Sequence, residues 1–264
     1  MKIKVFCLII FYMSVTCVSS VAQAYLTVKD YQLLKMDIAS TKPFESFSKI
    51  STSCSNDYLL KELTKASMTA GLLWGRHALG IHTSHYGYSK YGELTSSLAY
   101  SVKLGAKIAL GIRFHYIFQH VDHYESQHSV TFDFSMYAQV SRKLPFAIEP
   151  YNPARLKSGL TGNTVIPMRF TVATLYEYGE KLLFSVKIFK ELPGMFDVSA
   201  MCCYHPRDVV YLSVALSLHY VECGVMIRCR QLYFSAQIKC NYNLGFVPEA
   251  GILYPLPRKL KVGN

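Results

Sequence analysis

Two long alternating segments between residues 106 and 141 set the strongest constraint on the fold. In the first segment, residues 106–119, every even-numbered position is apolar, whereas polar residues and glycine fill most odd positions. In the second segment, residues 128–141, the even positions from Val130 onward are again apolar and the odd positions are mostly polar. Because side chains alternate between the two faces of a β-strand, a period of two predicts one strand for each segment. The two strands are expected to form a hairpin with one apolar face and one polar face.

The length of these strands favours a membrane barrel over a soluble fold. Strands of soluble proteins usually have about 5 to 6 residues, whereas a tilted strand that crosses a bilayer needs about 9 to 11. The pattern therefore predicts an all-β fold, a transmembrane antiparallel up-and-down β-barrel, and disfavours a secreted β-sandwich. The residues of the hairpin that we expect to face lipid are Ile108, Leu110, Ile112, Phe114, Phe132 and Phe134.

Composition agrees with a barrel. Of the 264 residues 51% are hydrophobic and only 17% are charged, yet no run of 18 apolar residues follows the N-terminus. An apolar chain without membrane helices is expected to hide its apolar residues in strand patterns. The formal net charge is +11, but its basic residues are scattered along the strands. Because nucleic-acid binding needs a clustered basic surface, we expect no nucleic-acid partner.

The N-terminus has the features of a cleaved signal peptide. Lys2 and Lys4 precede an apolar stretch, residues 5–18, and Ala22-Gln23-Ala24 resembles a signal-peptidase site. Residues 1–24 are therefore predicted to be removed, which points to the outer membrane of a Gram-negative envelope. A lipoprotein signal at Cys17 is the weaker alternative, because Val15-Thr16 is a poor lipobox.

Alternating patterns and turn signals divide the rest of the chain. Residues 25–66 form an N-terminal segment with a candidate first strand at residues 44–52, residues 67–256 form the barrel, and residues 257–264 form a basic tail. The barrel strands are expected at 67–74, 78–86, 93–103, 106–119, 128–141, 145–151, 164–177, 181–190, 195–204, 208–216, 219–229, 232–243 and 249–256. With the first strand the total is about 14, within a range of 12 to 14. Tight and longer connections alternate, and the tight turns should face the periplasm.

Six cysteines remain after cleavage of the signal peptide. They are Cys54, Cys202, Cys203, Cys223, Cys229 and Cys240. An even number in an exported chain permits disulfides. Cys223 and Cys229 instead share the apolar face of one predicted strand, and the adjacent Cys202 and Cys203 must point to opposite faces. We therefore favour the interpretation that the cysteines are small apolar residues of the barrel wall. Whether any of them pair in disulfides stays open.

Several short strings resemble a known family. They include Leu60-Lys61-Glu62-Leu63, Tyr91-Gly92-Glu93-Leu94, Leu104-Gly105-Ala106-Lys107-Ile108, Tyr151-Asn152-Pro153-Ala154-Arg155-Leu156 and Lys190-Glu191-Leu192. They look like the outer-membrane barrels of Bacteroidetes-type bacteria related to the PorV/PorQ components of type IX (Por) secretion, which are similar to FadL-type fatty-acid transporters. The resemblance covers roughly residues 60–254. Family members usually carry an N-terminal hatch rich in glycine and alanine, and residues 25–66 show none, so a plugged lumen is not expected.

The polar strand faces supply the candidate site residues. The residues expected to face the lumen and to pair with one another are Lys107, Arg113, Asp133, Arg169, Glu177, Lys187, Glu222, Arg228 and Lys239. His120, His123 and His128 are weak candidates for a metal site, because a loose loop rarely fixes the ligand geometry. His82 and His85 are three residues apart and so face opposite sides of a strand, which disfavours a hydrolase built with Ser84. We expect no catalytic residue, no metal and no cofactor.

Two functional hypotheses follow. The first is a non-enzymatic component or docking partner of a type IX secretion system, with outer-membrane lipid, secretion proteins or exported cargo as partners. The alternative is a FadL-like passive transporter of hydrophobic small molecules. An apolar lumen pocket and a hatch would favour the transporter, and the mixed polar lumen without a visible hatch favours the first hypothesis.

Overall fold

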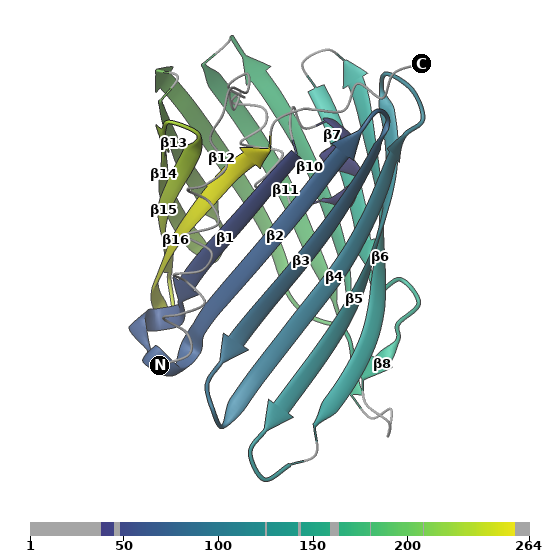
Figure 1. Ribbon diagram of the computed structural model, residues 1–264, viewed down its shortest axis with the longest axis vertical. Helices are drawn as coiled ribbons and strands as arrows, with labels where there is room; N and C mark the ends of the chain where they lie inside the picture. Colours follow the sequence, from purple (N-terminus) through teal and green to yellow (C-terminus); the bar gives the residue numbers. More distant parts are fainter. Residues whose placement is uncertain are drawn as a thin grey trace.

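Fourteen antiparallel strands close into a barrel in the computed structural model of the chain (Figure 1). The structure describes residues 38–44, 48–124, 126–141, 144–158, 164–179, 181–207 and 209–256. Each barrel strand pairs with the strands before and after it, and β1 pairs with β16 to close the sheet. The predicted up-and-down barrel of about 14 strands is therefore confirmed. The predicted signal peptide, residues 1–24, and the basic tail, residues 257–264, lie outside the described residues.

The barrel strands have the following bounds: β1 Ser48–Asn56, β2 Thr64–Trp74, β3 His77–Gly87, β4 Tyr91–Lys103, β5 Ile108–Val121, β6 Gln127–Ser141, β7 Leu144–Tyr151, β10 Met168–Tyr178, β11 Leu182–Leu192, β12 Phe196–Arg207, β13 Val210–Ser217, β14 Tyr220–Cys229, β15 Leu232–Asn241 and β16 Gly245–Leu256. The two-residue strands β8, Lys157–Ser158, and β9, Thr164–Val165, form a separate small sheet in the connection between β7 and β10. Three short 3-10 helices complete the elements: η1 Ala39–Phe44, η2 Asp57–Leu59 and η3 Lys61–Leu63. None of the described helices has the length and apolar character of a membrane span.

Two strand boundaries differ from the sequence prediction for identifiable reasons. The first strand begins at Ser48, four residues later than expected, because residues 39–44 form η1. The strand expected at residues 164–177 is interrupted, and β10 starts only at Met168. Pro167 precedes that start, and a proline lacks the amide hydrogen that a paired strand needs.

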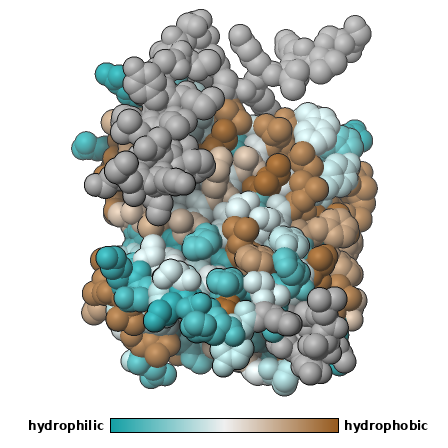
Figure 2. Space-filling model, turned by 60° about the horizontal axis from the view of Figure 1, so that its bottom comes forward, coloured by the Kyte–Doolittle hydropathy of each residue, from teal (hydrophilic) through white to brown (hydrophobic). Residues whose placement is uncertain are grey.

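The two faces of the barrel wall differ as the alternation of β5 and β6 requires. Ile108, Phe114 and Phe134 are 45%, 51% and 43% exposed and lie on the outer face. Their neighbours Arg113 and Asp133 are 7% and 1% exposed and lie on the lumen face. The other three residues expected on the apolar face, Leu110, Ile112 and Phe132, are half-buried on the outer side. Figure 2 shows hydrophobic residues along the flanks and hydrophilic residues over much of the end that faces the viewer.

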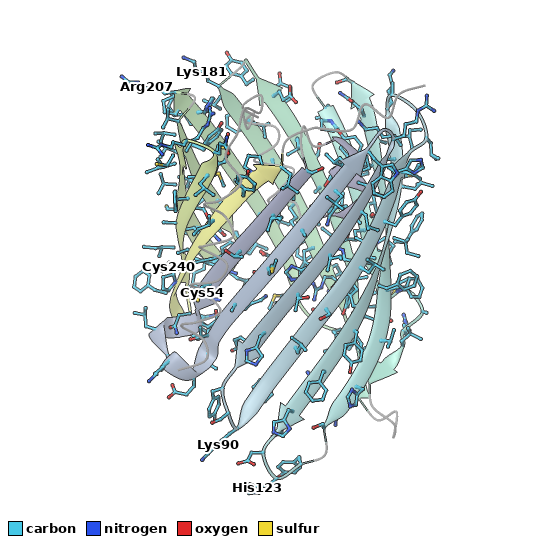
Figure 3. All side chains as sticks on the ribbon, in the orientation of Figure 1. Cys54, Lys90, His123, Lys181, Arg207 and Cys240 are labelled. Carbon is cyan, nitrogen blue, oxygen red and sulfur yellow. The ribbon has the colours of Figure 1, made fainter. Side chains whose placement is uncertain are left out.

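The connections separate the barrel into two ends. Figure 3 places Lys181 and Arg207 at one end and Lys90 and His123 at the other. The first end carries short turns, including residues 75–76 and 230–231, and the second carries longer connections, including residues 57–63 and the one between β7 and β10. We call these ends the turn end and the loop end.

A cluster of buried apolar side chains lies at the turn end of the lumen. The largest apolar side chains that are buried there are Tyr137, Leu175, Leu183, Tyr211 and Tyr233. Each of them lies within four residues of the point where its strand meets a short turn. Charged lumen-facing side chains such as Glu177 and Arg228 also lie near this end, but the group that lines the chamber described below lies in the other half.

Candidate functional site

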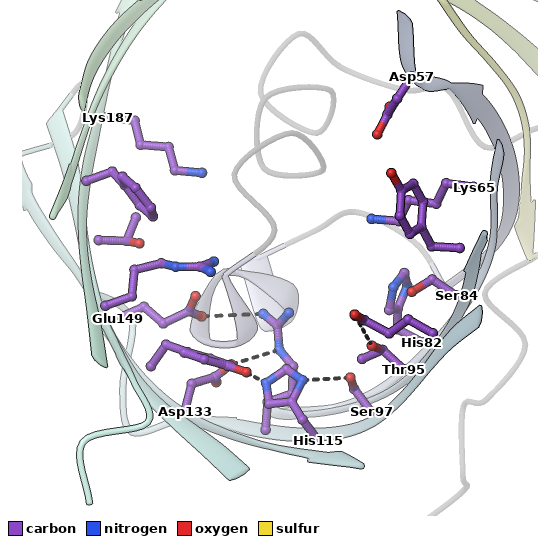
Figure 4. Close-up of a pocket in the computed structure, with 17 residues that line it drawn as sticks. Asp57, Lys65, His82, Ser84, Thr95, Ser97, His115, Asp133, Glu149 and Lys187 are labelled. Carbon is purple, nitrogen blue, oxygen red and sulfur yellow. Dashed lines mark hydrogen bonds and ion pairs between the residues drawn. The ribbon is translucent and has the colours of Figure 1, made fainter. Parts of the chain in front are cut away.

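A polar chamber of about 540 Å³ occupies the half of the lumen nearer the loop end. Figure 4 shows the residues that line it. Its wall is formed by lumen-facing residues of the strands β2 to β7, β10 and β11, together with Asp57 at the start of η2. Four carboxylates, two lysines, two arginines and two histidines are among the lining residues: Asp57, Glu93, Asp133, Glu149, Lys65, Lys187, Arg113, Arg169, His82 and His115. A chamber of this composition is suited to a polar or charged ligand.

Asp133 is the centre of a buried network at one side of the chamber. Its Oδ2 atom lies 3.4 Å from Nε of Arg113 and 2.8 Å from Nε2 of His115. Arg113 also reaches Oε2 of Glu149 through Nη2, at 3.4 Å. Arg113 and Asp133 are direct partners in the register of β5 and β6, which explains why they meet. The network links β5, β6 and β7 and accounts for two of the four carboxylates.

A serine extends this network. Oγ of Ser97 lies 2.8 Å from Nδ1 of His115, so serine, histidine and aspartate follow one another across three strands. A serine hydrolase also needs donors that stabilise an oxyanion, commonly backbone amides. β4 pairs with strands on both sides, so its backbone amides are used within the sheet. Asp133 moreover already pairs with Arg113. We therefore interpret the series as a structural network of the wall.

The wall formed by β10 and β11 is cationic. The guanidinium carbon of Arg169 lies 5.1 Å from the centroids of both the Tyr151 and the Phe189 rings. A cation over two ring faces is attracted to both, so the rings hold this side chain in place. Lys187 follows on the same wall, and Figure 4 shows its side chain pointing into the chamber. Glu191 is the acid that pairs with Arg169, with Oε2 at 4.0 Å from Nε.

The facing wall mixes both signs. Glu93 accepts hydrogen bonds from Nε2 of Gln119 at 3.1 Å and from Oγ1 of Thr95 at 3.4 Å. Asp57 and Lys65 line the same side, so one of its two negative charges is offset by a lysine. His82 completes this wall, with its Nδ1 atom 2.8 Å from Oγ1 of Thr69.

Helix η1 lies inside the barrel at the floor of the chamber. Ala39, Ser40 and Thr41 are fully buried, and η1 contacts β2 to β6. The amide of Ser40 donates a hydrogen bond of 2.9 Å to Oγ of Ser135. Ser135 is the next lumen-facing position after Asp133 toward the turn end, so η1 sits directly below the Asp133 network. We call residues 38–44 the plug.

The plug corrects the expectation of an unplugged lumen. That expectation rested on the lack of a segment rich in glycine and alanine in residues 25–66. Here the space is made by the wall instead: a Cβ atom on Gly111 would lie 2.7 Å from the Ser40 amide nitrogen, and one on Gly80 would collide with the end of the Lys42 side chain. The glycines of β3 and β5 thus leave room in the wall for the plug.

The predicted lumen-facing residues fall into three groups. Arg113, Asp133, Arg169 and Lys187 line the chamber. Glu177, Glu222, Arg228 and Lys239 occupy lumen-facing positions elsewhere in β10, β14 and β15, and Nζ of Lys239 lies 3.9 Å from the Tyr220 ring centroid. Lys107 was placed wrongly, because β5 begins at Ile108, two residues later than predicted, and Lys107 is exposed in the turn before it.

The three histidines considered for a metal do not converge. Nδ1 of His120 lies 3.1 Å from Oγ of Ser126, His123 is exposed at the loop end beside Asp122, and Nδ1 of His128 lies 2.7 Å from the Tyr116 hydroxyl. Within the described part of the chain, no three histidine, cysteine or acidic side chains are grouped as metal ligands. As predicted, His82 and His85 lie on opposite faces of β3, and the structure places His82 on the lumen side.

Sequence reasoning did not select His115, Ser97, Glu93 or Glu149 as site residues. All four lie on lumen-facing positions of alternating strands, so the period-two pattern was the available signal. Their convergence depends on the register between strands, which a single sequence does not show.

The cysteines lie mainly on the outer face. Cys54, Cys223 and Cys229 are exposed free thiols, and Cys240 is a half-buried one. Cys202 and Cys203 point to opposite faces, and Cys203 is fully buried on the lumen side. This arrangement favours the interpretation of small wall residues over a disulfide framework.

Comparisons with solved structures show that the barrel shares its fold with a transporter, a channel and a FadL homologue. No protein-family model matches the chain, and no curated protein matches it either. The solved structure of the Pseudomonas putida toluene transporter TodX has a TM-score of 0.64 at 8% identity, over 89% of this chain and 95% of that chain. The CymD monoaromatic hydrocarbon channel has a TM-score of 0.60 at 8% identity, over 90% and 95%. A Pseudomonas aeruginosa FadL homologue has a TM-score of 0.55 at 7% identity, over 82% and 92%. At sequence identities this low, the structural similarity shows a shared fold alone.

Proposed function

We propose that this protein is an outer-membrane channel of FadL-like architecture, through which a small organic molecule passes without chemical change. The observation that carries the proposal is the chamber of about 540 Å³ inside a closed barrel, bounded below by the plug. A volume of this size can hold a small ligand. The apolar outer face supports a position of the barrel in the lipid bilayer.

The channel hypothesis gains support over the secretion hypothesis from two observations. The structures described above that share this fold are named as a toluene transporter, a monoaromatic hydrocarbon channel and a FadL homologue. None of those three is named as a secretion component. The second observation is the plug, since the lack of a hatch was a reason to favour secretion. Type IX secretion therefore becomes the second hypothesis.

The charged lining of the chamber favours a polar or charged substrate over a hydrophobic one. A hydrophobic solute such as toluene would have to displace water from charged side chains without pairing with them, which costs free energy. Ten of the lining residues are acidic, basic or histidine, and these would be unfavourable neighbours for such a solute. The proposed substrate is therefore a small organic molecule with a polar or charged group.

Uptake by cells tests the channel. The full chain would be expressed in a Gram-negative host that lacks its major porins, and uptake of radiolabelled benzamide would be compared with that of cells expressing an unrelated barrel. Faster uptake supports the channel, and equal uptake contradicts it. A deletion strain of the source organism provides a second test. If it left exported cargo in the periplasm but took up small aromatic solutes normally, the secretion hypothesis would be supported instead.

A further inference from the structure

The charges of the chamber are arranged unequally around its wall. Asp133 and Glu149 pair with Arg113, and Asp133 also contacts His115, so these acids are bound within their own network. Glu93 is held by Gln119 and Thr95. The charged residues that β10 and β11 contribute to the chamber lining are the cations Arg169 and Lys187.

Arg169 is prepared to bind an anion near the mouth. It is the second residue of β10, which begins at the loop end, and its guanidinium lies between the rings of Tyr151 and Phe189. Its Nε atom is buried and makes no hydrogen bond within the described residues, and Glu191 approaches only to 4.0 Å. A guanidinium held in this way can present paired N–H donors to a carboxylate with little loss of conformational freedom.

Lys187 lies deeper in the same wall. It is five residues from the loop end of β11, and its direct partners in the register are Ala173 and Ser199, neither of which is charged. Among the described residues, no carboxylate forms an ion pair with Lys187. An anion that leaves Arg169 therefore meets a second cation before it reaches the plug.

We propose that Arg169 and Lys187 form a two-step path for a small organic anion, a carboxylate, through this chamber. The inference rests on the proposed channel function and specifies its substrate class. The facing wall carries Asp57 and Glu93 against the single lysine Lys65, so its net charge is negative and repels an anion toward β10 and β11. The rings of Tyr151 and Phe189 lie beside Arg169. The apolar part of a small ligand bound to Arg169 would therefore contact aromatic carbon atoms.

Three probes of nearly equal shape test the charge preference. Benzoate is anionic, benzamide is neutral and benzamidine is cationic at pH 7. Binding of each would be measured by isothermal titration calorimetry on the full-length protein in nanodiscs, with empty nanodiscs as the blank. We expect benzoate to bind about tenfold more tightly than benzamide, because one ion pair in a partly shielded site is worth about that factor. Benzamidine should bind most weakly.

Charge-removing variants localise the effect. The double variant Arg169→Gln, Lys187→Gln should reduce the preference for benzoate over benzamide to twofold or less. Lys239→Gln removes a lumen-facing cation that does not line the chamber and should leave the preference unchanged. Heat-modifiable migration in gels verifies that each variant is folded.

The outcomes separate the inference from the channel itself. Equal binding of benzoate and benzamide, tighter binding of benzamidine, or a preference that survives in the double variant would overturn the anion path. The absence of binding by all three probes would overturn it as well. The uptake of benzamide by cells is measured independently, so the channel can stand while the anion path fails.

Discussion

The amide nitrogen of Ser40 donates a hydrogen bond of 2.9 Å to Oγ of Ser135, although the two residues are 95 positions apart in the chain. This bond fastens the plug to the middle of β6. Gly111, the lumen-facing neighbour of Ser135 across the β5–β6 hairpin, lies against the same plug residues. The floor of the chamber therefore depends on three small residues.

Gly111→Ala should loosen the plug. The new Cβ would lie 2.7 Å from both the Ser40 amide nitrogen and Oγ of Ser135, closer than atoms can approach, so the plug must shift. We expect a larger single-channel conductance in planar bilayers. Gly224→Ala is the matched control, because its Cβ would meet Oγ of Ser213 at 2.7 Å without touching the plug. Equal conductance in the two variants would contradict a plug held at Gly111.

Replacement of Leu98 by lysine should destabilise the barrel in bilayers. Leu98 is 49% exposed near the middle of β4, on the outer face. A lysine facing lipid near the midplane costs about 2 to 4 kcal/mol. Thr95→Lys, on the lumen face of the same strand, would point into the polar chamber and should cost much less. Urea-induced unfolding in lipid vesicles measures both, and similar losses would argue that the faces are assigned wrongly.

Asp133→Asn should lower the free energy of unfolding by about 3 to 5 kcal/mol, since it removes the buried negative charge that Arg113 and His115 share. Glu249→Gln serves as the control, because this half-buried carboxylate accepts a hydrogen bond from Gln237. Its loss should be much smaller. A small effect of Asp133→Asn in the same unfolding assay would mean that chamber water replaces the lost contacts.

Asn152→Ala should release the long loop between β7 and β10. The side-chain amide donates to the carbonyl oxygens of Ile166 at 2.7 Å and Leu156 at 3.3 Å, and Oδ1 accepts from the Leu156 amide at 2.8 Å. Asn152 also has a φ of 48°, which asparagine tolerates better than alanine.

Limited trypsin digestion measures the release, with cleavage after Arg155 as the expected event and an intact barrel as the remaining product. Asn243→Ala, in the short loop of residues 242–244, is the control and should leave cleavage at Arg155 unchanged. Resistance of Asn152→Ala to trypsin would show that other contacts hold the loop.

Alternation in the sequence carries most of the fold. Because a strand has a period of two, the residues between Ile108 and Phe134 reveal which side chains lie on the apolar outer face and which, such as Arg113 and Asp133, lie opposite. Local signals also indicated the number of strands, since turns separate long alternating segments. These signals are less precise at the ends of strands. Lys107 was predicted to lie within a strand, but it precedes the first residue of β5.

The tertiary structure decided what the sequence left open, because register, closure and plug placement join residues that are distant in the chain. Ser97, His115 and Asp133 meet only through the pairing of three strands, and Arg169 becomes fixed only between the rings of Tyr151 and Phe189. No pattern in residues 38–44 predicts that they lie inside the barrel. Their position depends on the space that small residues such as Gly111 and Ser135 leave in the wall. The sequence by itself determined the two faces of the barrel, whereas the three-dimensional packing determined the chamber between them.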